Sequence, residues 1–257
     1  MSDIQVSLTP AQMEIFNSPA RFKVAACGRR FGKSYLAAWT LLIKGLESQS
    51  KDIFYIAPTF QQAKDILWGL LKDLGRDVIK STHENTATIT LINGRKIYLK
   101  GSDRPDTLRG VGLAYVVMDE YAFMKPSVFE QIIRPTLADV KGEALFIGTP
   151  EGRNHFYDIY IAAQDDPEWE AFSFNSTDNP LIDPKEIEVA RRSMSSQAFR
   201  QEFEASFESF SGGIFKDEWF ETSKEPDYGH YIVSVDPAGF EQSSKDRGKS
   251  GSKLDET

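Results

Sequence analysis

A Gly-Lys-Ser turn between a buried strand and an apolar helix limits the folds open to this chain. Gly32-Lys33-Ser34 follows a strand predicted over Phe22 to Ala26 and precedes a helix predicted to run to about Leu46. This is the order of a phosphate-binding loop, or P-loop, whose pattern is Gly, four residues and then Gly-Lys-Ser or Gly-Lys-Thr. Cys27 stands at the first position in place of Gly. A chance Gly-Lys-Ser at a strand–helix turn is the alternative, and the strand and helix on either side count against it.

The loop carries the groups needed to bind ATP with Mg²⁺. Its backbone N–H groups and the N-terminus of the following helix would surround the phosphates. Gly32 lets the main chain come close, Lys33 would neutralise the β- and γ-phosphates, and the Ser34 hydroxyl would bind Mg²⁺. The loop residues expected to contact ATP are Gly28, Arg29, Arg30, Phe31, Gly32, Lys33 and Ser34. With two arginines in the loop, at least one is expected to meet phosphate.

A second apolar strand, predicted over Ala114 to Met118, ends in Asp119-Glu120. In P-loop NTPases an Asp at such a strand end holds Mg²⁺, and the adjacent Glu can polarise the attacking water. Adjacent residues leave a strand in different directions, so Asp119 is expected to face the metal and Glu120 the γ-phosphate. A solvated acidic pair at a strand end is the alternative. The P-loop earlier in the chain favours the catalytic interpretation.

The first 150 residues alternate strand-like and helix-like segments, which predicts an α/β fold with a mainly parallel sheet flanked by helices. Together with the two motifs, this indicates a P-loop NTPase of the RecA/ASCE-like kind. Asn93-Gly94 between two β-rich segments predicts a hairpin of Thr86 to Leu91 with Lys96 to Lys100. The other predicted elements are a short helix opened by Thr9-Pro10, strands over Ile53 to Ala57 and Ala144 to Ile147, and helices from Thr59 to about Leu74 and from near Pro126.

After Pro150 the chain becomes more polar and a domain boundary is expected. Asp183-Pro184 predicts the start of a long helix to about Ser206, and Ser211-Gly212-Gly213 is typical of a hinge. We therefore predict a P-loop ATPase domain over 1–210, with a helical lid subdomain at about 175–210, and a linker over 211–229. Residues 230–257 are predicted to be the incomplete start of another domain, with a strand over Tyr231 to Val235.

Composition excludes some classes of function. The chain has 257 residues, of which 40% are hydrophobic, enough for a large core. A net charge of -8 provides no bulk positive field for nucleic acid, although a local basic face is compatible with it. Cys27 is the one cysteine, so no intramolecular disulfide is possible, and the three histidines show no zinc spacing. No segment approaches the roughly 18 apolar residues of a membrane span, so a soluble intracellular protein is expected.

Three further residues have two open interpretations each. Thr149, at the end of the strand before Pro150, would sense hydrolysis if it lies beside the γ-phosphate, or it belongs to an ordinary strand-end turn. Gln12 has an amide that can pair with adenine, or it is a surface glutamine of a helix. Arg109 would stabilise a transferring phosphoryl group, or it is a solvated loop arginine.

Taken in order, the motifs resemble those of terminase large subunits, the DNA-packaging ATPases of bacteriophages or prophages. The doubled arginine before Gly-Lys-Ser is the most telling feature, and the resemblance covers nearly the whole chain. The segments that carry it are Thr9-Pro10-Ala11-Gln12, Gly28-Arg29-Arg30-Phe31-Gly32-Lys33-Ser34, Ala57-Pro58-Thr59, Leu108-Arg109-Gly110, Val116-Val117-Met118-Asp119-Glu120 and Gly148-Thr149-Pro150.

For the nucleotide, the resemblance implies that Gln12 senses adenine and that Lys33 and Ser34 hold phosphate and Mg²⁺. It also implies that either Arg29 or Arg30 senses the γ-phosphate. Cys27 is a mild departure, because the first position of the loop varies in this family.

For catalysis, the resemblance implies that Asp119 holds Mg²⁺, that Glu120 is the catalytic carboxylate and that Thr149 is the coupling residue. Arg109 matches the arginine finger that acts on a neighbouring subunit. The active enzyme would then be a homo-oligomeric ring, a pentamer in the family, and the isolated chain would be a monomer or self-associate weakly.

The family also has a C-terminal nuclease domain with an RNase-H-like fold, which uses Mg²⁺ or Mn²⁺. The segment that ends in Asp236 resembles the start of this domain, and Asp236 matches the first metal ligand of its site. A lone carboxylate cannot organise a two-metal site, so the chain is expected to lack nuclease activity that the full-length protein has. Expected partners are double-stranded DNA, the portal of the procapsid and the small terminase subunit, but no membrane. The expected location is the host cell cytoplasm, with transient docking on the procapsid.

The favoured function is ATP hydrolysis that drives double-stranded DNA into a procapsid. A helicase-like or remodelling P-loop translocase is one alternative, and it would need a second RecA-like domain. A slow nucleotide-dependent switch is another, and Glu120 counts against it because a switch needs no water-activating carboxylate. Arg95, Lys96 and Lys100 are candidate DNA contacts, with a solvated basic face as the plainer interpretation.

Overall fold

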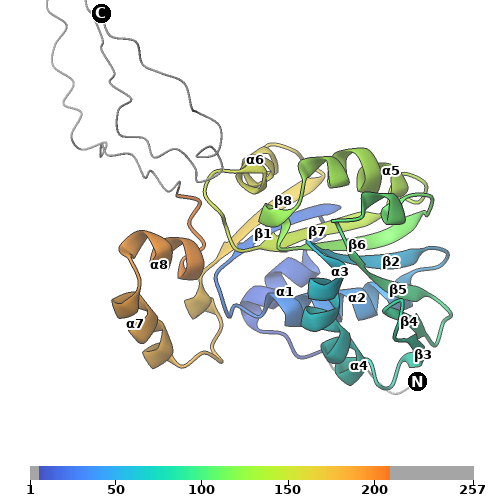
Figure 1. Ribbon diagram of the computed structural model, residues 1–257, viewed down its shortest axis with the longest axis horizontal. Helices are drawn as coiled ribbons and strands as arrows, with labels where there is room; N and C mark the ends of the chain where they lie inside the picture. Colours follow the sequence, from blue (N-terminus) through green and yellow to red (C-terminus); the bar gives the residue numbers. More distant parts are fainter. Residues whose placement is uncertain (1–5, 209–257) are drawn as a thin grey trace, which may run out of the picture. The chain divides into compact units, whose positions relative to one another are not determined.

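The computed structural model describes residues 6–208, all of which lie in the compact unit Met1–Ser211. Within this part of the chain, eight strands form one sheet in the order β3-β4-β5-β2-β6-β7-β1-β8 (Figure 1). The strands are β1 (Phe22–Cys27), β2 (Asp52–Ala57), β3 (Ile79–His83), β4 (Thr88–Leu91), β5 (Lys96–Gly101), β6 (Leu113–Asp119), β7 (Glu143–Gly148) and β8 (Trp169–Phe174).

The sheet is mainly parallel, as predicted. In the spatial order β5-β2-β6-β7-β1-β8, each strand pairs in parallel with its neighbour. Strands β3 and β4 add an antiparallel edge beside β5. Strands of a parallel sheet are covered on both faces and are therefore apolar along their length. All six residues of β1 are buried accordingly. The predicted hairpin is present as β4 and β5, and Gly94 in its loop has a φ of +84°, a backbone conformation that glycine adopts without strain.

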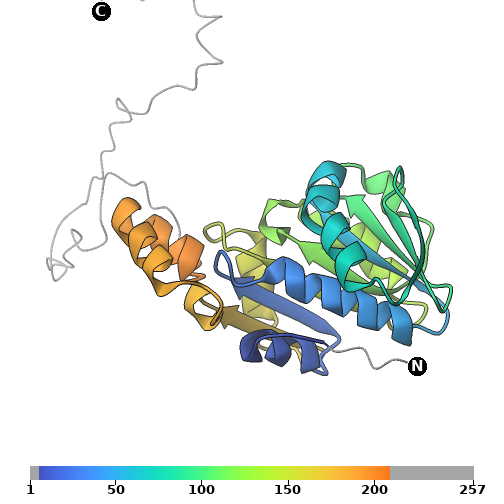
Figure 2. The same cartoon turned by 90° about the horizontal axis from the view of Figure 1, so that it is seen from below.

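Helices cover both faces of the sheet (Figures 1 and 2). One face carries α1 (Pro10–Asn17), α2 (Lys33–Glu47), α3 (Phe60–Ala63), the π-helical turn η1 (Lys64–Trp68) and α4 (Gly69–Leu74). The other face carries η3 (Tyr121–Phe123), η4 (Val128–Ile133), α5 (Arg134–Thr136) and α6 (His155–Ala162). Short 3₁₀ turns are η2 (Pro105–Leu108) and η5 (Ser176–Asp178), and the remaining helices are α7 (Pro184–Ser193) and α8 (Ser196–Phe203).

Each face of the sheet has its own hydrophobic core. In β1, Ala25 and Cys27 belong to the core under α2, while Val24 and Ala26 belong to the opposite core. This split follows from the two-residue period of a strand, which sends alternate side chains to opposite faces. The strand that leads into the P-loop is thus held from both sides, which fixes the position of the loop.

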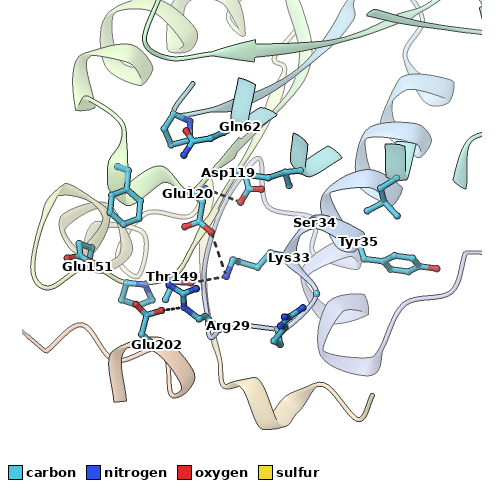
Figure 3. Close-up of a pocket in the computed structure, with 17 residues that line it drawn as sticks. Arg29, Lys33, Ser34, Tyr35, Gln62, Asp119, Glu120, Thr149, Glu151 and Glu202 are labelled. Carbon is cyan, nitrogen blue, oxygen red and sulfur yellow. Dashed lines mark hydrogen bonds and ion pairs between the residues drawn. The ribbon is translucent and has the colours of Figure 1, made fainter. Parts of the chain in front are cut away.

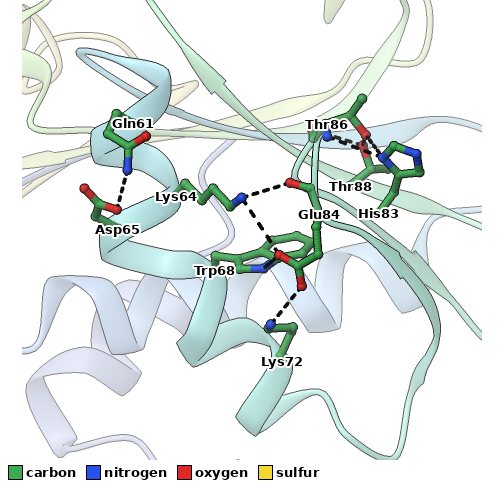
Figure 4. A network of polar contacts seen from close by, with 9 residues as sticks. All are labelled: Gln61, Lys64, Asp65, Trp68, Lys72, His83, Glu84, Thr86 and Thr88. Atoms are coloured by element: carbon green, nitrogen blue, oxygen red, sulfur yellow. Dashed lines mark hydrogen bonds and ion pairs between the residues drawn. The ribbon is translucent and has the colours of Figure 1, made fainter.

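The predicted helix from Thr59 to Leu74 is present as the continuous run α3, η1 and α4. Thr59 begins it with a capping box, in which its side chain accepts a hydrogen bond from the backbone of Gln62. The turn between β3 and β4 is attached to this run through Glu84, whose carboxylate accepts hydrogen bonds from Trp68 Nε1 at 2.7 Å and Lys72 Nζ at 3.1 Å (Figure 4). These contacts hold the antiparallel edge of the sheet against the helix.

Two strands and one α-helix were not predicted from the sequence. Strand β8 contains three aromatic residues, a composition that favours strands, but it lies in the region that we interpreted as merely polar. Strand β3 is largely exposed and therefore has no apolar pattern to mark it. Helix α6 is capped by Asn154, whose side chain accepts a hydrogen bond from the backbone of Phe156.

The single helix predicted from Asp183 to about Ser206 is wrong. The chain instead forms α7 and α8, with Met194 in an extended conformation between them. The reason is a second helix cap, because the Ser195 side chain accepts a hydrogen bond from the backbone of Ala198. A serine cap favours a new helix start over continuation of the first helix.

Some predictions fall outside the described residues. These are the linker over 211–229, the strand from Tyr231 to Val235, and Asp236 with the rest of 230–257. Within the described residues, no helix is both long enough and apolar enough to span a membrane.

Candidate active site

The P-loop, the acidic pair and Thr149 come together at the carboxyl ends of three adjacent strands. In the sheet order β6-β7-β1, the P-loop follows β1, Asp119 ends β6 and Thr149 follows β7. Open α/β sheets bind ligands at this edge, where the loops after the strands diverge. A cavity of about 890 Å³ opens here, and its lining includes Lys33, Ser34 and Glu120 (Figure 3). Lys33, Glu120 and Thr149, proposed from three separate motifs, therefore line one cavity.

The P-loop has the backbone geometry of a phosphate cradle. Gly32 precedes α2 with a φ of +95°, and Arg30 also has a left-handed φ of +63°. Helix α2 starts at Lys33 without a side-chain cap, so the N–H groups of its first turn face the cavity edge without an intrahelical partner. A helix N-terminus of this kind, with its partial positive charge, favours an anion. The loop residues therefore fit the phosphates of a nucleotide.

Gln12 supports the P-loop from behind. Its amide nitrogen donates to the carbonyl oxygens of Phe31 at 3.0 Å and Gly32 at 3.3 Å, and its amide oxygen accepts from the backbone of Thr9. The residue is 3% exposed. A side chain at Gly32 would collide with this amide. The structure thus places Gln12 at the loop, while its contact with adenine stays a prediction.

Lys33 contacts two other predicted site residues, Thr149 and Glu120. Its Nζ donates a hydrogen bond to Thr149 Oγ1 at 2.8 Å and lies 3.9 Å from the Glu120 carboxylate (Figure 3). It also lies 3.5 Å from the carbonyl oxygen of Cys27. Only 11% of the Lys33 side chain is exposed, so little water screens these contacts. Cys27 itself is fully buried, and burial raises the pKa of its thiol, which makes it a packing residue rather than a nucleophile.

The two residues of the acidic pair have different environments. Asp119 is 2% exposed, and its Oδ1 accepts a hydrogen bond from the Glu120 backbone at 2.9 Å. Glu120 has a left-handed φ of +53°, which is uncommon for a residue with a side chain and is often found at functional sites. This turn of the backbone directs the Glu120 carboxylate into the cavity and toward Lys33.

The surroundings of the two carboxyl groups raise the pKa of both. Burial raises the pKa of Asp119, and burial followed by the neighbouring Asp119 charge raises the pKa of Glu120. The positive charge of Lys33 acts against burial and lowers both pKa values. A raised pKa makes Glu120 a stronger proton acceptor when it is ionised, which suits a group that activates water.

The residues also fit Mg²⁺ bound together with a nucleotide. Ser34 and Asp119 both line the cavity and offer oxygen ligands, which this cation prefers. Within the described residues there is no group of three or more His, Cys, Asp or Glu side chains arranged to hold a metal alone. Mg²⁺ is commonly bound through one or two protein oxygens plus phosphates and water, so this donor set matches a shared Mg²⁺–nucleotide site.

Residues 25–222 match the family model described as terminase large subunit, T4likevirus-type, N-terminal. The chain belongs to the terminase large-subunit family. The large terminase subunit of Escherichia phage T5 is 36% identical over 205 residues, which cover 76% of this chain and 46% of that protein. The large subunit of Thermus phage G20c is 29% identical over 240 residues, covering 79% of this chain and 49% of the relative. This terminase chain spans about half the length of the curated relatives it matches.

Solved structures confirm the fold. The ATPase domain of the large terminase of Thermus phage P74-26 has a TM-score of 0.69 and 26% identity, covering 78% of this chain and 94% of that domain. The large terminase of another thermophilic bacteriophage shares the fold with a TM-score of 0.70 at 17% identity, over 82% of this chain and 57% of that one. Structures of this second large terminase in complex with ADP and with ATP-gamma-S are among the similar ones. The predicted P-loop NTPase fold and the predicted family are both confirmed.

In this terminase chain the two loop arginines contact the segment after β8. The backbone carbonyl of Arg29 accepts a hydrogen bond from Ser176 Oγ at 2.6 Å, and that of Arg30 accepts one from Asn179 Nδ2 at 2.7 Å. The Arg29 guanidinium forms an ion pair with Glu202 of α8 (Figure 3). The P-loop main chain is thus fixed by residues far along the sequence, and either arginine stays a candidate for the γ-phosphate contact.

A second link joins α8 to the loop after Thr149. Gln201 is 2% exposed, its amide oxygen accepts from the backbone of Gly152 at 3.2 Å, and its amide nitrogen donates to Glu151 at 3.1 Å. Sequence reasoning missed Gln201, Glu151 and Glu202, although Glu151 and Glu202 line the cavity. No local motif marks them, because their role depends on where α8 packs.

Arg109 does not line its own chain's cavity. It follows η2, its side chain is 56% exposed, and the nearest acid is Asp106 at 3.7 Å. The basic residues near the hairpin are also away from the cavity. Arg95 donates to the Ser50 carbonyl at 2.8 Å, and Lys100 lies over the rings of Phe54 and Tyr98. Contact of these residues with DNA stays a prediction.

Proposed function

We propose that this chain is the ATP-hydrolysing part of a phage DNA-packaging motor, and that hydrolysis drives double-stranded DNA into a procapsid. The observation that carries the proposal is the meeting of Lys33, Thr149 and Glu120 at one cavity, with Lys33 Nζ 2.8 Å from the Thr149 hydroxyl and 3.9 Å from Glu120. A cation for phosphate and a carboxylate for water are the working parts of phosphoryl transfer. Similarity to the P74-26 terminase ATPase domain supports the same activity.

The reaction is an in-line attack of water on the γ-phosphate. The P-loop N–H groups and Lys33 hold the phosphates, and Lys33 exchanges its contact with Thr149 for phosphate oxygens. Glu120 orients the water and accepts its proton as the new P–O bond forms. The bond to the β–γ bridging oxygen breaks, and ADP leaves with that electron pair. Mg²⁺, held by Ser34 and Asp119 when bound, supplies charge neutralisation for the transferring phosphoryl group.

Arg109 completes the site from a neighbouring subunit in this proposal. Its exposed side chain lies outside the cavity of its own chain, as an arginine that acts in trans requires. An arginine finger accelerates phosphoryl transfer by about 10³ to 10⁵. The working form is therefore a homo-oligomeric ring, a pentamer by analogy with the family, and the isolated chain is a monomer with low activity.

We infer further functions for the full-length protein. It acts on double-stranded DNA at the portal of a procapsid, together with the small terminase subunit, in the cytoplasm of the host cell. The full-length protein adds a nuclease with Mg²⁺ or Mn²⁺, whose first ligand is Asp236.

Mixing two inactive variants tests the motor proposal. Mg²⁺-dependent ATP turnover is measured over a range of protein concentrations for wild type, Glu120→Gln, Arg109→Ala and mixtures of the two variants. Turnover per chain is expected to rise with concentration, each variant alone to be inactive, and the mixture to recover part of the activity. Recovery is expected because a Glu120→Gln subunit still carries Arg109 for the intact Glu120 of its neighbour.

Other outcomes decide against parts of the proposal. Turnover that is independent of concentration, with a fully active Arg109→Ala, shows that Arg109 does not act in trans. A wild-type chain that binds ATP but never hydrolyses it favours the nucleotide-dependent switch.

A further inference from the structure

A buried hydrogen bond links β2 to Asp119, a residue of the proposed Mg²⁺ site. Tyr55 of β2 donates its hydroxyl to Asp119 Oδ2 of β6 at 2.5 Å. Both residues are buried, with Tyr55 0% and Asp119 2% exposed. Tyr55 lies opposite Val117 in the parallel pairing of the two strands, so Asp119 is two residues further along the same face of the sheet. The phenol therefore reaches the carboxylate from the hydrophobic core on the α2 face of the sheet, and Tyr55 itself does not line the cavity.

The two oxygens of Asp119 are thus held by two different donors. Oδ1 accepts from the backbone N–H of Glu120 at 2.9 Å, and Oδ2 accepts from Tyr55. An ionised carboxylate offers about four acceptor positions, so each oxygen keeps capacity for a further ligand. Two donors in fixed positions determine the plane of the carboxylate, while its free lone pairs remain available at the cavity that Asp119 lines.

We propose that Tyr55 is a positioning residue that orients Asp119 for the Mg²⁺ that accompanies the nucleotide. The inference rests on the proposed function and adds a residue that neither the sequence motifs nor the family comparison marks. Hydrogen-bond partners behind a metal ligand fix its orientation, and their loss typically weakens metal binding about 10- to 100-fold.

The same sheet contains a matched tyrosine without this contact. Tyr115 of β6 is 1% exposed, and the described residues give its hydroxyl no hydrogen-bond partner. A buried tyrosine in this sheet therefore does not need its hydroxyl to be satisfied by a carboxylate. Tyr55→Phe and Tyr115→Phe each remove one buried oxygen atom, but only the first removes a contact to the proposed Mg²⁺ ligand.

The test separates metal binding from nucleotide binding. Affinity for ATP-gamma-S is measured by titration calorimetry in EDTA and over a series of Mg²⁺ concentrations, for wild type, Tyr55→Phe and Tyr115→Phe. In Tyr55→Phe, the Mg²⁺ concentration that gives half of the Mg²⁺-dependent gain in affinity is expected to rise about tenfold or more. Affinity in EDTA is expected to stay within about twofold, and Tyr115→Phe is expected to match wild type in both conditions.

A double-mutant comparison then tests whether Tyr55 acts through Asp119. In an Asp119→Asn background, Tyr55→Phe is expected to cause no further loss of the Mg²⁺ effect, since the two residues act as one unit. The proposal is overturned if Tyr55→Phe has the Mg²⁺ dependence of wild type, or if Tyr115→Phe shifts it equally. A wild-type chain that shows no Mg²⁺-dependent nucleotide binding refutes the proposed function itself, which distinguishes the two failures.

Discussion

Lys33 Nζ donates a 2.8 Å hydrogen bond to Thr149 Oγ1, and this contact joins residues 116 positions apart in the sequence. It connects the P-loop after β1 to the turn after β7, two neighbouring strands of the sheet. The same ammonium group lies 3.9 Å from Glu120. In the proposed function, a phosphate bound by Lys33 would compete with the hydroxyl of Thr149 for this ammonium group.

Removing the Thr149 hydroxyl is expected to slow hydrolysis more than it weakens binding. Thr149→Val keeps the shape of the side chain but removes the hydroxyl that accepts from Lys33 Nζ, the shortest of the contacts that position this ammonium group near Glu120. We expect turnover to fall about tenfold, the equivalent of one charge-assisted hydrogen bond, with nucleotide affinity nearly unchanged. Steady-state kinetics and nucleotide titration measure the two effects. Thr149→Ser, which keeps the hydroxyl, is expected to retain turnover, and equal losses in both variants would exclude the hydroxyl as the cause.

Glu120→Gln is expected to retain nucleotide binding and lose turnover. The amide keeps the size of the side chain but cannot accept a proton from water, and general-base catalysis contributes about 10²- to 10⁴-fold. We expect turnover to fall at least a hundredfold, measured as the rate at which phosphate is released from ATP. The control is Glu130→Gln, which makes the same chemical change at an exposed position of η4. A Glu120→Gln chain with more than half of wild-type turnover would assign the base to another residue.

The parts of the fold that could be predicted from the sequence are those with local signals. The buried strand before Gly32, the Asn93-Gly94 hairpin and the Thr59 helix start each depend on a few consecutive residues, and each is present. Strand β3 is exposed and carries no apolar pattern. The break between α7 and α8 depends on whether Ser195 caps a helix or lies within one, and the longer helix was the wrong choice.

For the site, the same distinction applies. The P-loop and Asp119-Glu120 have spacings that phosphate chemistry imposes, so the sequence alone is enough to single out Lys33 and Glu120. Glu202 has no such spacing, because its place beside Arg29 is set by the packing of α8. The hydroxyl of Tyr55 lies in an apolar strand, where a tyrosine is indistinguishable by pattern from an ordinary core residue.

A methyl group at Gly28 is expected to displace the segment that fixes the P-loop. A Cβ there would lie 2.5 Å from the carbonyl oxygen of Phe203 and 2.8 Å from the backbone nitrogen of Ser176, neither of which can rotate away. Overpacking of this kind costs about 1–3 kcal/mol. We expect Gly28→Ala to lower the free energy of unfolding by this amount and to weaken nucleotide binding.

Gly69→Ala is the matched control for that experiment. Gly69 begins α4 within a continuous helical run, and a Cβ there meets nothing within 4 Å. The same substitution should stabilise the chain by about 0.5–1 kcal/mol, because alanine is the better helix former. Urea unfolding measures both variants. If Gly28→Ala is as stable as wild type and binds nucleotide normally, Ser176 and Phe203 do not hold the loop as tightly as their distances indicate.

Lys23 is a buried cation away from the active site. It lies in β1, is 2% exposed and pairs in register with Glu170 of β8. Burial, followed by the positive charge of Lys44, lowers the pKa of Lys23 to about 8, while Glu143 and Glu170 act in the opposite direction. The folded chain therefore disfavours the charged form of Lys23 relative to the unfolded chain.

The depressed pKa predicts how stability depends on pH. Between pH 8 and about 10.4, the usual lysine pKa, the unfolded chain binds more protons at this position than the folded chain, so the Lys23 contribution to stability rises with pH. Lys23→Met removes the charge and keeps an apolar stem. It should be more stable than wild type by about 3 kcal/mol at pH 7, since one pKa unit corresponds to 1.36 kcal/mol. That advantage should shrink steadily above pH 8.

Urea unfolding of wild type and Lys23→Met from pH 7 to pH 10 measures this dependence. The contributions of the other titrating groups cancel in the difference between the two free energies of unfolding. Lys80→Met, at an exposed position of β3, controls for the loss of one positive charge. An advantage of Lys23→Met that is the same at every pH would show that the gain comes from packing, and that the buried ammonium carries no penalty.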